Sequence, residues 1–190
     1  IADFPPIFLT SARAVIAALL GCAFLARVRA PVPDRRALVR LGLVALGVVI
    51  GFPLLTALAL QHITAAHSVV FIGLLPLSTA IFSVLRGEPR PRLAFWVFSA
   101  AGALIVGVFA LGRSGIGALA GDILMILSVI ACGFGYAEGA RLSRSLGGVV
   151  VISWALLVSL PVVLASALLT APPHWPPLAA PSWLALAYVS

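Results

Sequence analysis

Ionisable side chains are rare in this sequence, and a few of them interrupt long apolar stretches. Arg13 lies seven residues inside a stretch that begins at Pro6, so in a helix it would sit roughly 10 Å deep. A guanidinium there could line a pathway and attract an anionic group, or it could reach back to the interface. Glu138 is a carboxylate inside a later apolar stretch, three residues before Arg141. It could carry protons, although an ion pair with Arg141 across one helical turn is the simpler interpretation.

The other acidic residues and the histidines have simpler structural interpretations. Asp122 begins an apolar helix, where the helix dipole stabilises an anion. Glu88 is surrounded by arginines in the sequence, which indicates salt bridges within a loop. His62 and His67 are five residues apart, whereas a helical metal pair needs the (i, i+4) spacing. Pathway lining or a proton step stays open for the two histidines, and we expect no metal, no cofactor and no catalytic residue.

Prolines, hydroxyls and aromatic rings within the apolar stretches form a second group of candidates. Pro76 removes one backbone hydrogen bond and predicts a bend, which either shapes a cavity or serves packing. The hydroxyls of Ser78 and Thr79 are near enough in sequence to partner the freed carbonyl. Tyr136 could stack on a substrate or could only anchor a helix at the membrane interface.

The elements that hold these residues are expected to be membrane-spanning helices. The chain is 63% hydrophobic and 9% charged, against about 25% charged residues in soluble domains. Residues 67–85 carry no formal charge, and as a helix they would span roughly 28 Å, close to the hydrocarbon thickness of a bilayer. The net charge of +7 does not indicate nucleic-acid binding, because the arginines lie in short loops without a basic, aromatic face.

Charged and polar breaks divide the chain into six apolar spans and the start of a seventh. The polar segment 60–68 splits the uncharged stretch 41–85 into the second and third spans, and clustered prolines end the sixth. The predicted spans are about 6–26, 41–60, 68–85, 93–112, 119–140, 148–169 and a start at Pro181.

The arginines are distributed very unevenly among the connections. Ten of the twelve lie in connections after the first, third and fifth spans, and Arg113 lies after the fourth. Because short cytoplasmic loops collect positive charge, the first connection is predicted to be cytoplasmic and residue 1 to lie outside. All twelve cations are arginine, which together with the abundance of alanine, glycine and leucine indicates a GC-rich bacterial genome. We expect a multi-pass protein of such a cell to lie in the inner (plasma) membrane.

Two pairs of spans are similarly spaced, with an offset of about 143 residues. The first span corresponds to the sixth, and the second to the seventh. A repeat of five helices must be inverted across the membrane, because five is odd. Inverted repeats are found in many secondary transporters.

Small residues are predicted to let helices approach closely. Gly133, Gly135 and Gly139 share one face of the fifth span, and Gly42, Gly47 and Gly51 are candidates for the same role in the second.

Three segments together resemble a transporter family. "LALQHITAAHSVVFIGLLPLSTAIFSVLRGEPRPR" is similar to the third and fourth helices of EamA-type transporters in the drug/metabolite transporter superfamily, with small residues, a central Pro-Leu-x-Thr-Ala and a closing Gly-Glu. "GDILMILSVIACGFGYAEGARLSR" resembles the helix that opens the family's second repeat, and "FLTSARAVIAALL" resembles its second helix. The aromatic residue that is commonly Trp in the family is Phe134 or Tyr136 here.

The resemblance implies an all-α, multi-pass integral membrane bundle of two inverted five-helix repeats, incomplete here. Residues 1–112 would hold helices two to five of the first repeat, and residues 113–190 would hold helices six, seven and part of eight. The sequence would then be a fragment that lacks the first helix and the C-terminal helices.

The resemblance also implies a secondary active transporter that exports small metabolites, amino acids or drugs across the cytoplasmic membrane by alternating access. Its partners would be the bilayer and a small-molecule substrate. Coupling to protons and the oligomeric state are left open. The expected pathway residues are Arg13, Thr56, Phe71, Pro76, Thr79, Tyr136 and Glu138. ATP is not expected to drive transport, because a Gly-rich phosphate loop ending in Lys cannot occur in a chain without Lys.

Two alternatives from other classes are an integral-membrane enzyme and a non-transporting structural subunit. An enzyme would need ionisable groups gathered near one membrane face, and the sequence shows no such cluster. A passive scaffold has little need for prolines in mid-span.

Overall fold

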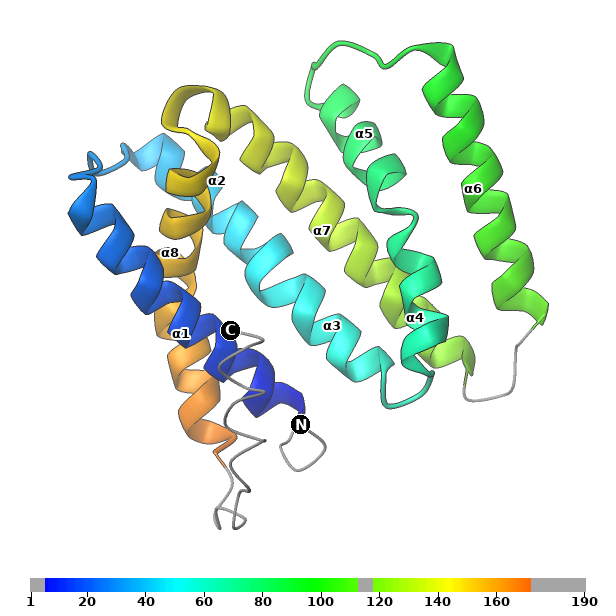
Figure 1. The fold of residues 1–190 in the computed structure, drawn as a ribbon, viewed down its shortest axis with the longest axis horizontal. Helices are drawn as coiled ribbons and strands as arrows, with labels where there is room; N and C mark the ends of the chain where they lie inside the picture. The colour runs from blue at the N-terminus through cyan, green and yellow to red at the C-terminus, as the bar shows by residue number, and fades with distance from the viewer. Residues whose placement is uncertain (1–5, 113–117, 172–190) are drawn as a thin grey trace.

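The computed structural model describes residues 6–112 and 118–171, and it shows helices joined by short connections (Figure 1). The described elements, in chain order, are α1 Pro6–Arg27, α2 Arg35–Val44, the π-helix η1 Ala45–Gly51, α3 Phe52–Ala59, α4 Ala65–Ile72, α5 Leu75–Leu85, α6 Leu93–Gly112, α7 Ala118–Leu146 and α8 Gly148–Leu169. The start of the predicted seventh span, at Pro181, lies outside the described residues.

Five of the described helical stretches are long and apolar enough to cross a membrane. They are Ile7–Arg27, Arg35–Ala59, Ala65–Leu85, Leu119–Leu146 and Gly148–Leu169, and Leu93–Phe109 is a shorter apolar helix. Large apolar side chains cover their outer surfaces, as at Leu46 and Leu168, which are 60% and 71% exposed. The prediction of an all-helical, multi-pass membrane protein is therefore confirmed.

Capping side chains decide where the second and third spans begin. Asp34 accepts a hydrogen bond from the Ala37 amide at 2.9 Å, so α2 begins at Arg35. The helix therefore starts earlier in the chain than predicted, since the prediction placed its start near residue 41. Thr64 accepts a hydrogen bond from the His67 amide at 3.3 Å, and α4 begins at Ala65, inside the polar segment 60–68 that was predicted to separate the two spans. A side-chain oxygen at such a position satisfies an amide that has no partner inside the helix.

The predicted bend at Pro76 is present. Helix α4 ends at Ile72, and α5 begins at Leu75 with Pro76 in its first turn, where the missing amide is tolerated. The expectation that Ser78 would partner the freed carbonyl is wrong. Its hydroxyl donates instead to the Val129 carbonyl of α7 at 3.2 Å, because α5 packs closely enough on α7 to offer that acceptor.

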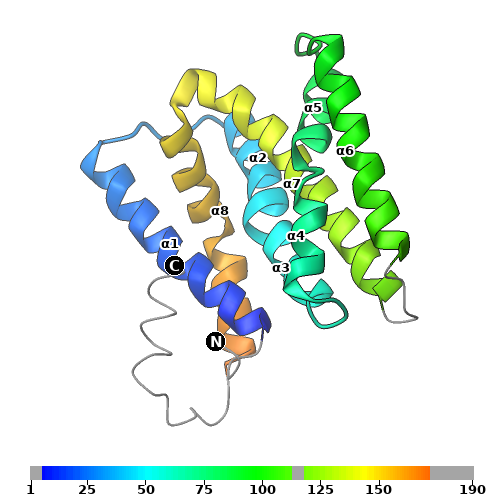
Figure 2. The same cartoon turned by 45° about the vertical axis from the view of Figure 1, so that its right-hand side comes forward.

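Helix α7 is the centre of the described bundle. It packs against α2, η1 and α3 on one side, α4 and α5 on another, and α8; Figures 1 and 2 show it crossing between these groups. Helices α1 and α8 lie side by side and run in opposite directions (Figures 1 and 2).

The arginine-rich connections lie together at one end of the bundle. The α1–α2, α5–α6 and α7–α8 connections are at the top of Figure 1, and the α3–α4 connection is at the opposite end. This arrangement agrees with the alternation predicted from the arginines. Helices α5 and α7 therefore run in the same direction and both end at the arginine-rich side.

Glycines set the closest approaches between helices. A Cβ atom on Gly133 would lie 2.2 Å from the Ser78 hydroxyl, and one on Gly135 would lie 2.8 Å from a Val48 methyl. A Cβ on Gly47 would lie 2.3 Å from the Ala131 carbonyl oxygen. The predicted small-residue packing is confirmed at these positions but is wrong at Gly42, around which no atom lies within 4 Å of the added carbon.

Candidate functional site

A cleft between α5, α6 and α7 brings together three of the residues expected along a pathway. Its volume is about 450 Å³, and we name it the α5 cleft. Pro76 and Thr79 line it from α5, and Tyr136 lines it from α7. Its remaining walls are formed by Leu75, Ala80, Ser83, Pro89, Pro91 and Phe95. The bend before Pro76 turns this part of α5, which gives the cleft its wall.

A second cleft of about 360 Å³ lies between η1, α7 and α8, and we name it the α8 cleft. Tyr136 lines this cleft too, so its ring stands between the two clefts. Gly135 and Gly139 supply low walls, because neither has a side chain. Tyr136 is 45% exposed, which leaves its ring accessible to a bound molecule.

The linings determine what these clefts can bind. Thr79, Ser83 and Tyr136 are the hydroxyl-bearing residues that line the α5 cleft, and Ser143, whose hydroxyl donates to the Gly139 carbonyl at 2.7 Å, lines the α8 cleft. No charged side chain lines either cleft among the described residues. Both volumes fall within the range of small-molecule sites, in which apolar walls and a few polar groups fix the orientation of the ligand. Small neutral, zwitterionic or aromatic compounds fit this chemistry.

A third cleft, of about 310 Å³, is apolar and lies between α5, α6 and α7. Side chains such as Leu77, Ile81 and Ile130 form its walls. Ser78 also borders it, but its hydroxyl is bonded to Val129. This lining fits a hydrocarbon chain better than a polar substrate.

Thr56 belongs to a hydroxyl chain between α3 and α7. Ser128 donates to the Phe52 carbonyl at 3.1 Å, so the Thr56 hydroxyl, 2.9 Å away, donates to Ser128. Ser128 is completely buried, and the chain satisfies its oxygen without water. Sequence analysis did not single out Ser128.

Two further residues expected along the pathway, Phe71 and Arg13, lie away from the clefts. Phe71 is 2% exposed and packs its ring against His67, with a centroid separation of 5.6 Å. Arg13 is exposed on α1. Neither residue lines the three clefts described above.

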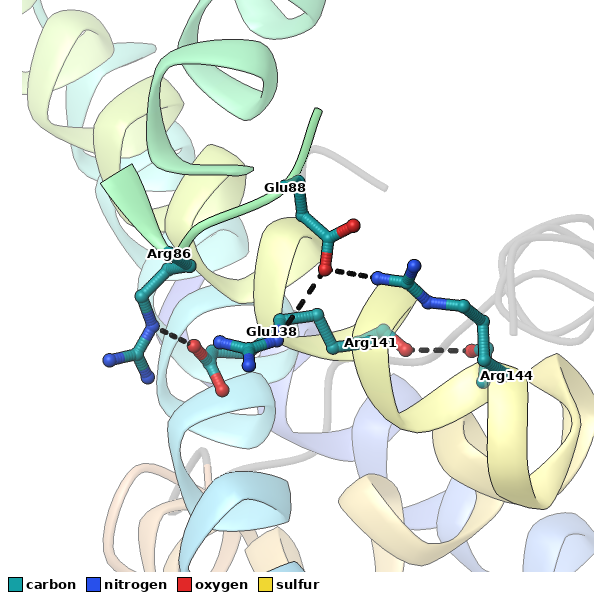
Figure 3. A network of polar contacts seen from close by, with 7 residues as sticks. Arg86, Glu88, Glu138, Arg141 and Arg144 are labelled. Atoms are coloured by element: carbon teal, nitrogen blue, oxygen red, sulfur yellow. Dashed lines mark hydrogen bonds and ion pairs between the residues drawn. The ribbon is translucent and has the colours of Figure 1, made fainter. Parts of the chain in front are cut away.

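Glu138 pairs with Arg86, and the expected pair with Arg141 is wrong (Figure 3). Glu138 is fully buried, and the Arg86 guanidinium lies over the Phe134 ring at 5.7 Å from its centroid. The pair joins the end of α5 to α7. The hydrogen bond to Glu138 raises the pKa of the Arg86 guanidinium, so Arg86 is charged throughout the physiological range.

Glu88 pairs with arginines of α7 instead of its neighbours in the loop. It accepts a hydrogen bond from Arg144, and the Arg141 Nε lies 3.6 Å from its Oε1 (Figure 3). The Arg144 hydrogen bond lowers the pKa of the Glu88 carboxyl. With Arg86 and Glu138 these residues form what we name the arginine-end network, which ties the α5–α6 connection to α7.

At the opposite end of α7, Asp122 contacts His67 of α4. The distance between Asp122 Oδ1 and His67 Nε2 is 2.8 Å, and the two side chains are 10% and 6% exposed. Sequence analysis interpreted Asp122 through the helix dipole alone and missed this pair. Each residue lies near the start of its helix, and α4 and α7 run in the same direction. Equal depth in two parallel helices is the signal that could have predicted this contact.

Comparison with known proteins gives two matches. Residues 1–113 match the EamA-like transporter family. The whole chain is 55% identical over 190 residues to a protein of Bacillus subtilis (strain 168) named "Uncharacterized transporter YdeK", and it covers 66% of that protein's length. No solved structure matches the chain.

Proposed function

Because the chain belongs to the EamA-like transporter family, we propose that it is part of a secondary active transporter that exports small metabolites, amino acids or drugs. The family is one of transporters, so the integral-membrane enzyme is set aside. The proposed location is the bacterial plasma membrane, in line with the Bacillus relative.

The observation that carries the proposal is the position of Tyr136 between two clefts on the central helix. A single ring that borders both clefts can stay in contact with a substrate while access changes from one side to the other. Pro76 and Thr79 are proposed to form the opposite wall of the pathway. The absence of charged lining around the described clefts favours amino acids, aromatic compounds and amphiphilic cations over multiply charged anions.

Alternating access is proposed to follow from two inverted repeats, residues 1–112 and 113–190. The antiparallel packing of α1 on α8 supports this division, because an inverted pair must run in opposite directions across the membrane. Helix α7 would belong to the second repeat, and the arginine-end network would join it to the first.

The test is counterflow in proteoliposomes that contain the full-length transporter. Liposomes loaded with one unlabelled compound are diluted into its labelled form, with single amino acids and tetraphenylphosphonium as probes. The transporter should accumulate at least one labelled probe, and Tyr136→Ala should lower the initial rate about tenfold, which corresponds to about 1.4 kcal/mol of lost binding.

The matched control is Phe98→Ala, which removes a ring of similar size from a surface position on α6 that is 77% exposed. Its rate should equal that of the parent protein. Absence of counterflow for every probe with well-folded protein would favour the structural subunit. Equal losses in Tyr136→Ala and Phe98→Ala would remove Tyr136 from the pathway.

A further inference from the structure

The His67–Asp122 pair is a buried ionisable site that the proposed substrate pathway does not use. It lies near the end of the bundle opposite to the arginine-rich connections, where α4 and α7 begin side by side. The His67 ring also lies against two aromatic rings, Phe71 at 5.6 Å and Phe109 at 5.4 Å between centroids. Aromatic packing and the low exposure of both side chains keep water away from the contact.

The net charge of this pair depends on a single proton. Nε2 of His67 faces the carboxylate, so in the neutral imidazole it carries the hydrogen and Nδ1 holds a lone pair. The pair then has a net charge of −1 at a site with little exposure to water, which is costly, and the dipole at the start of α7 offsets only part of that cost. A proton that adds to Nδ1 makes the imidazolium cation and brings the net charge of the pair to zero.

Among the described residues, the helices that pack around the pair offer few other charges to compensate the carboxylate. Helices α3, α4, α5 and α6 carry no Asp, Glu, Lys or Arg within their described bounds, and His67 is the ionisable residue of α4. On α7 the next residue with a formal charge is Glu138, sixteen residues away, or roughly 24 Å along the helix, and the titratable side chains between them are Cys132 and Tyr136. The near neighbour is His62, an exposed residue whose Cβ lies 3.2 Å from a carbon added to Gly121.

We propose that His67 and Asp122 form a proton-binding site whose protonation holds α4 against α7 at the outer end of the bundle. A charged imidazolium and a carboxylate attract each other more strongly than a neutral ring and a carboxylate do. Loss of the proton restores the net negative charge of the pair, admits water and loosens the contact. The inference rests on the proposed function, in which it makes the proton the coupling ion.

The experiment measures how pH changes access to the α4–α7 contact, and it needs no substrate. In the full-length transporter with its native cysteines replaced, a single cysteine at Met125 reports on the buried side of α7, where exposure is 0%. A single cysteine at Leu119, 63% exposed on the same helix, corrects for the reactivity of the thiol itself. Labelling rates with a water-soluble maleimide are compared at about pH 5.5 and about pH 8, between which histidine changes charge.

The Met125→Cys rate, divided by the Leu119→Cys rate, should rise at least about fivefold between the acidic and the alkaline condition, the lower end of typical coupling between linked sites. His67→Gln and Asp122→Asn should each make the ratio independent of pH. Either variant suffices if the other does not fold. His62→Gln, which changes the neighbouring histidine, should keep the pH dependence.

A flat ratio in the parent protein would overturn the proposal, as would a pH dependence that survives His67→Gln or disappears in His62→Gln. The counterflow assay separates this result from the fate of the proposed function. Counterflow with a flat labelling ratio removes the proton site alone, and pH-dependent labelling without any counterflow removes transport while the proton site stands.

Discussion

The close approach of η1 to α7 yields a prediction that two alanine substitutions can test. A Cβ atom on Gly47 would lie 2.3 Å from the Ala131 carbonyl oxygen and 3.1 Å from the Gly135 Cα. Nonbonded carbon contacts are optimal near 3.5 Å, so the two helices must separate by about 1 Å to admit the methyl group. Both obstacles are backbone atoms, which cannot turn aside as a flexible side chain would.

Gly42→Ala is the matched control, because no atom lies within 4 Å of a carbon added at Gly42. Both substitutions remove a glycine from the same continuous helical stretch, so both gain up to about 1 kcal/mol of helix propensity. Forcing a methyl group into a packed contact costs about 1–3 kcal/mol. The free energy of unfolding of Gly47→Ala should therefore lie about 1–3 kcal/mol below that of Gly42→Ala.

The measurement is reversible unfolding of the full-length protein in mixed detergent micelles, followed by tryptophan fluorescence as the denaturing detergent increases. The change in midpoint between the two variants gives the difference in free energy. Equal stabilities for Gly47→Ala and Gly42→Ala would refute the close approach. Gly47→Ala should also slow counterflow, because the displaced helix borders the α8 cleft.

Three further predictions concern the arginine-end network and the clefts. Arg86→Ala should destabilise the protein more than Glu138→Gln in the same unfolding assay, because the first leaves a fully buried carboxylate unpaired and the second leaves a partly exposed guanidinium that can turn to water; equal losses would contradict this. The hydrogen bond from Arg144 lowers the pKa of Glu88, so its stabilisation is complete above the unfolded pKa, near 4.3, and is lost as pH falls through the lower folded pKa. Acid titration of the unfolding midpoint should show that loss in the parent and not in Glu88→Gln. Tyr136→Phe should keep the affinity of aromatic probes in counterflow within about threefold of the parent value, whereas Tyr136→Ala should lower that affinity about tenfold. The reverse order would show that the hydroxyl of Tyr136 contributes more to binding than its ring does.

The apolar spans could be predicted from the sequence because they depend on composition and length. Charged breaks located the connections, and Pro76 located the bend, because a missing amide acts on its own helix wherever that helix packs. Pro76, Thr79 and Tyr136 were expected on one pathway from the family resemblance, and the α5 cleft contains all three. The substrate role of these residues stays a prediction.

Packing partners were harder to predict. Phe71 was expected on the pathway with the same reasoning as Thr79, yet it is buried against His67. Neighbouring residues on a helix point to different sides of it. The family resemblance predicts which helix a residue belongs to, but it does not predict how that helix is rotated about its own axis. Gly42 and Gly47 show the same limit, since only one of these two glycines meets another helix.

The ion pairs show which signal would have revealed the packing. Sequence analysis paired Glu138 with Arg141, because contacts between nearby residues are the only ones that spacing along one helix indicates. The true partners are distant but regular: Arg86 and Glu138 are 52 residues apart, His67 and Asp122 are 55, and Ser78 bonds a carbonyl 51 residues ahead. A nearly constant separation is what two helices running in the same direction must produce, because both advance along the membrane normal at the same rate per residue. Once arginine placement had made the third and fifth spans parallel, matching each histidine or arginine of one with an acid at equal depth in the other would have selected both pairs. Charge complementarity at a fixed offset thus carries information about helix register that hydropathy lacks.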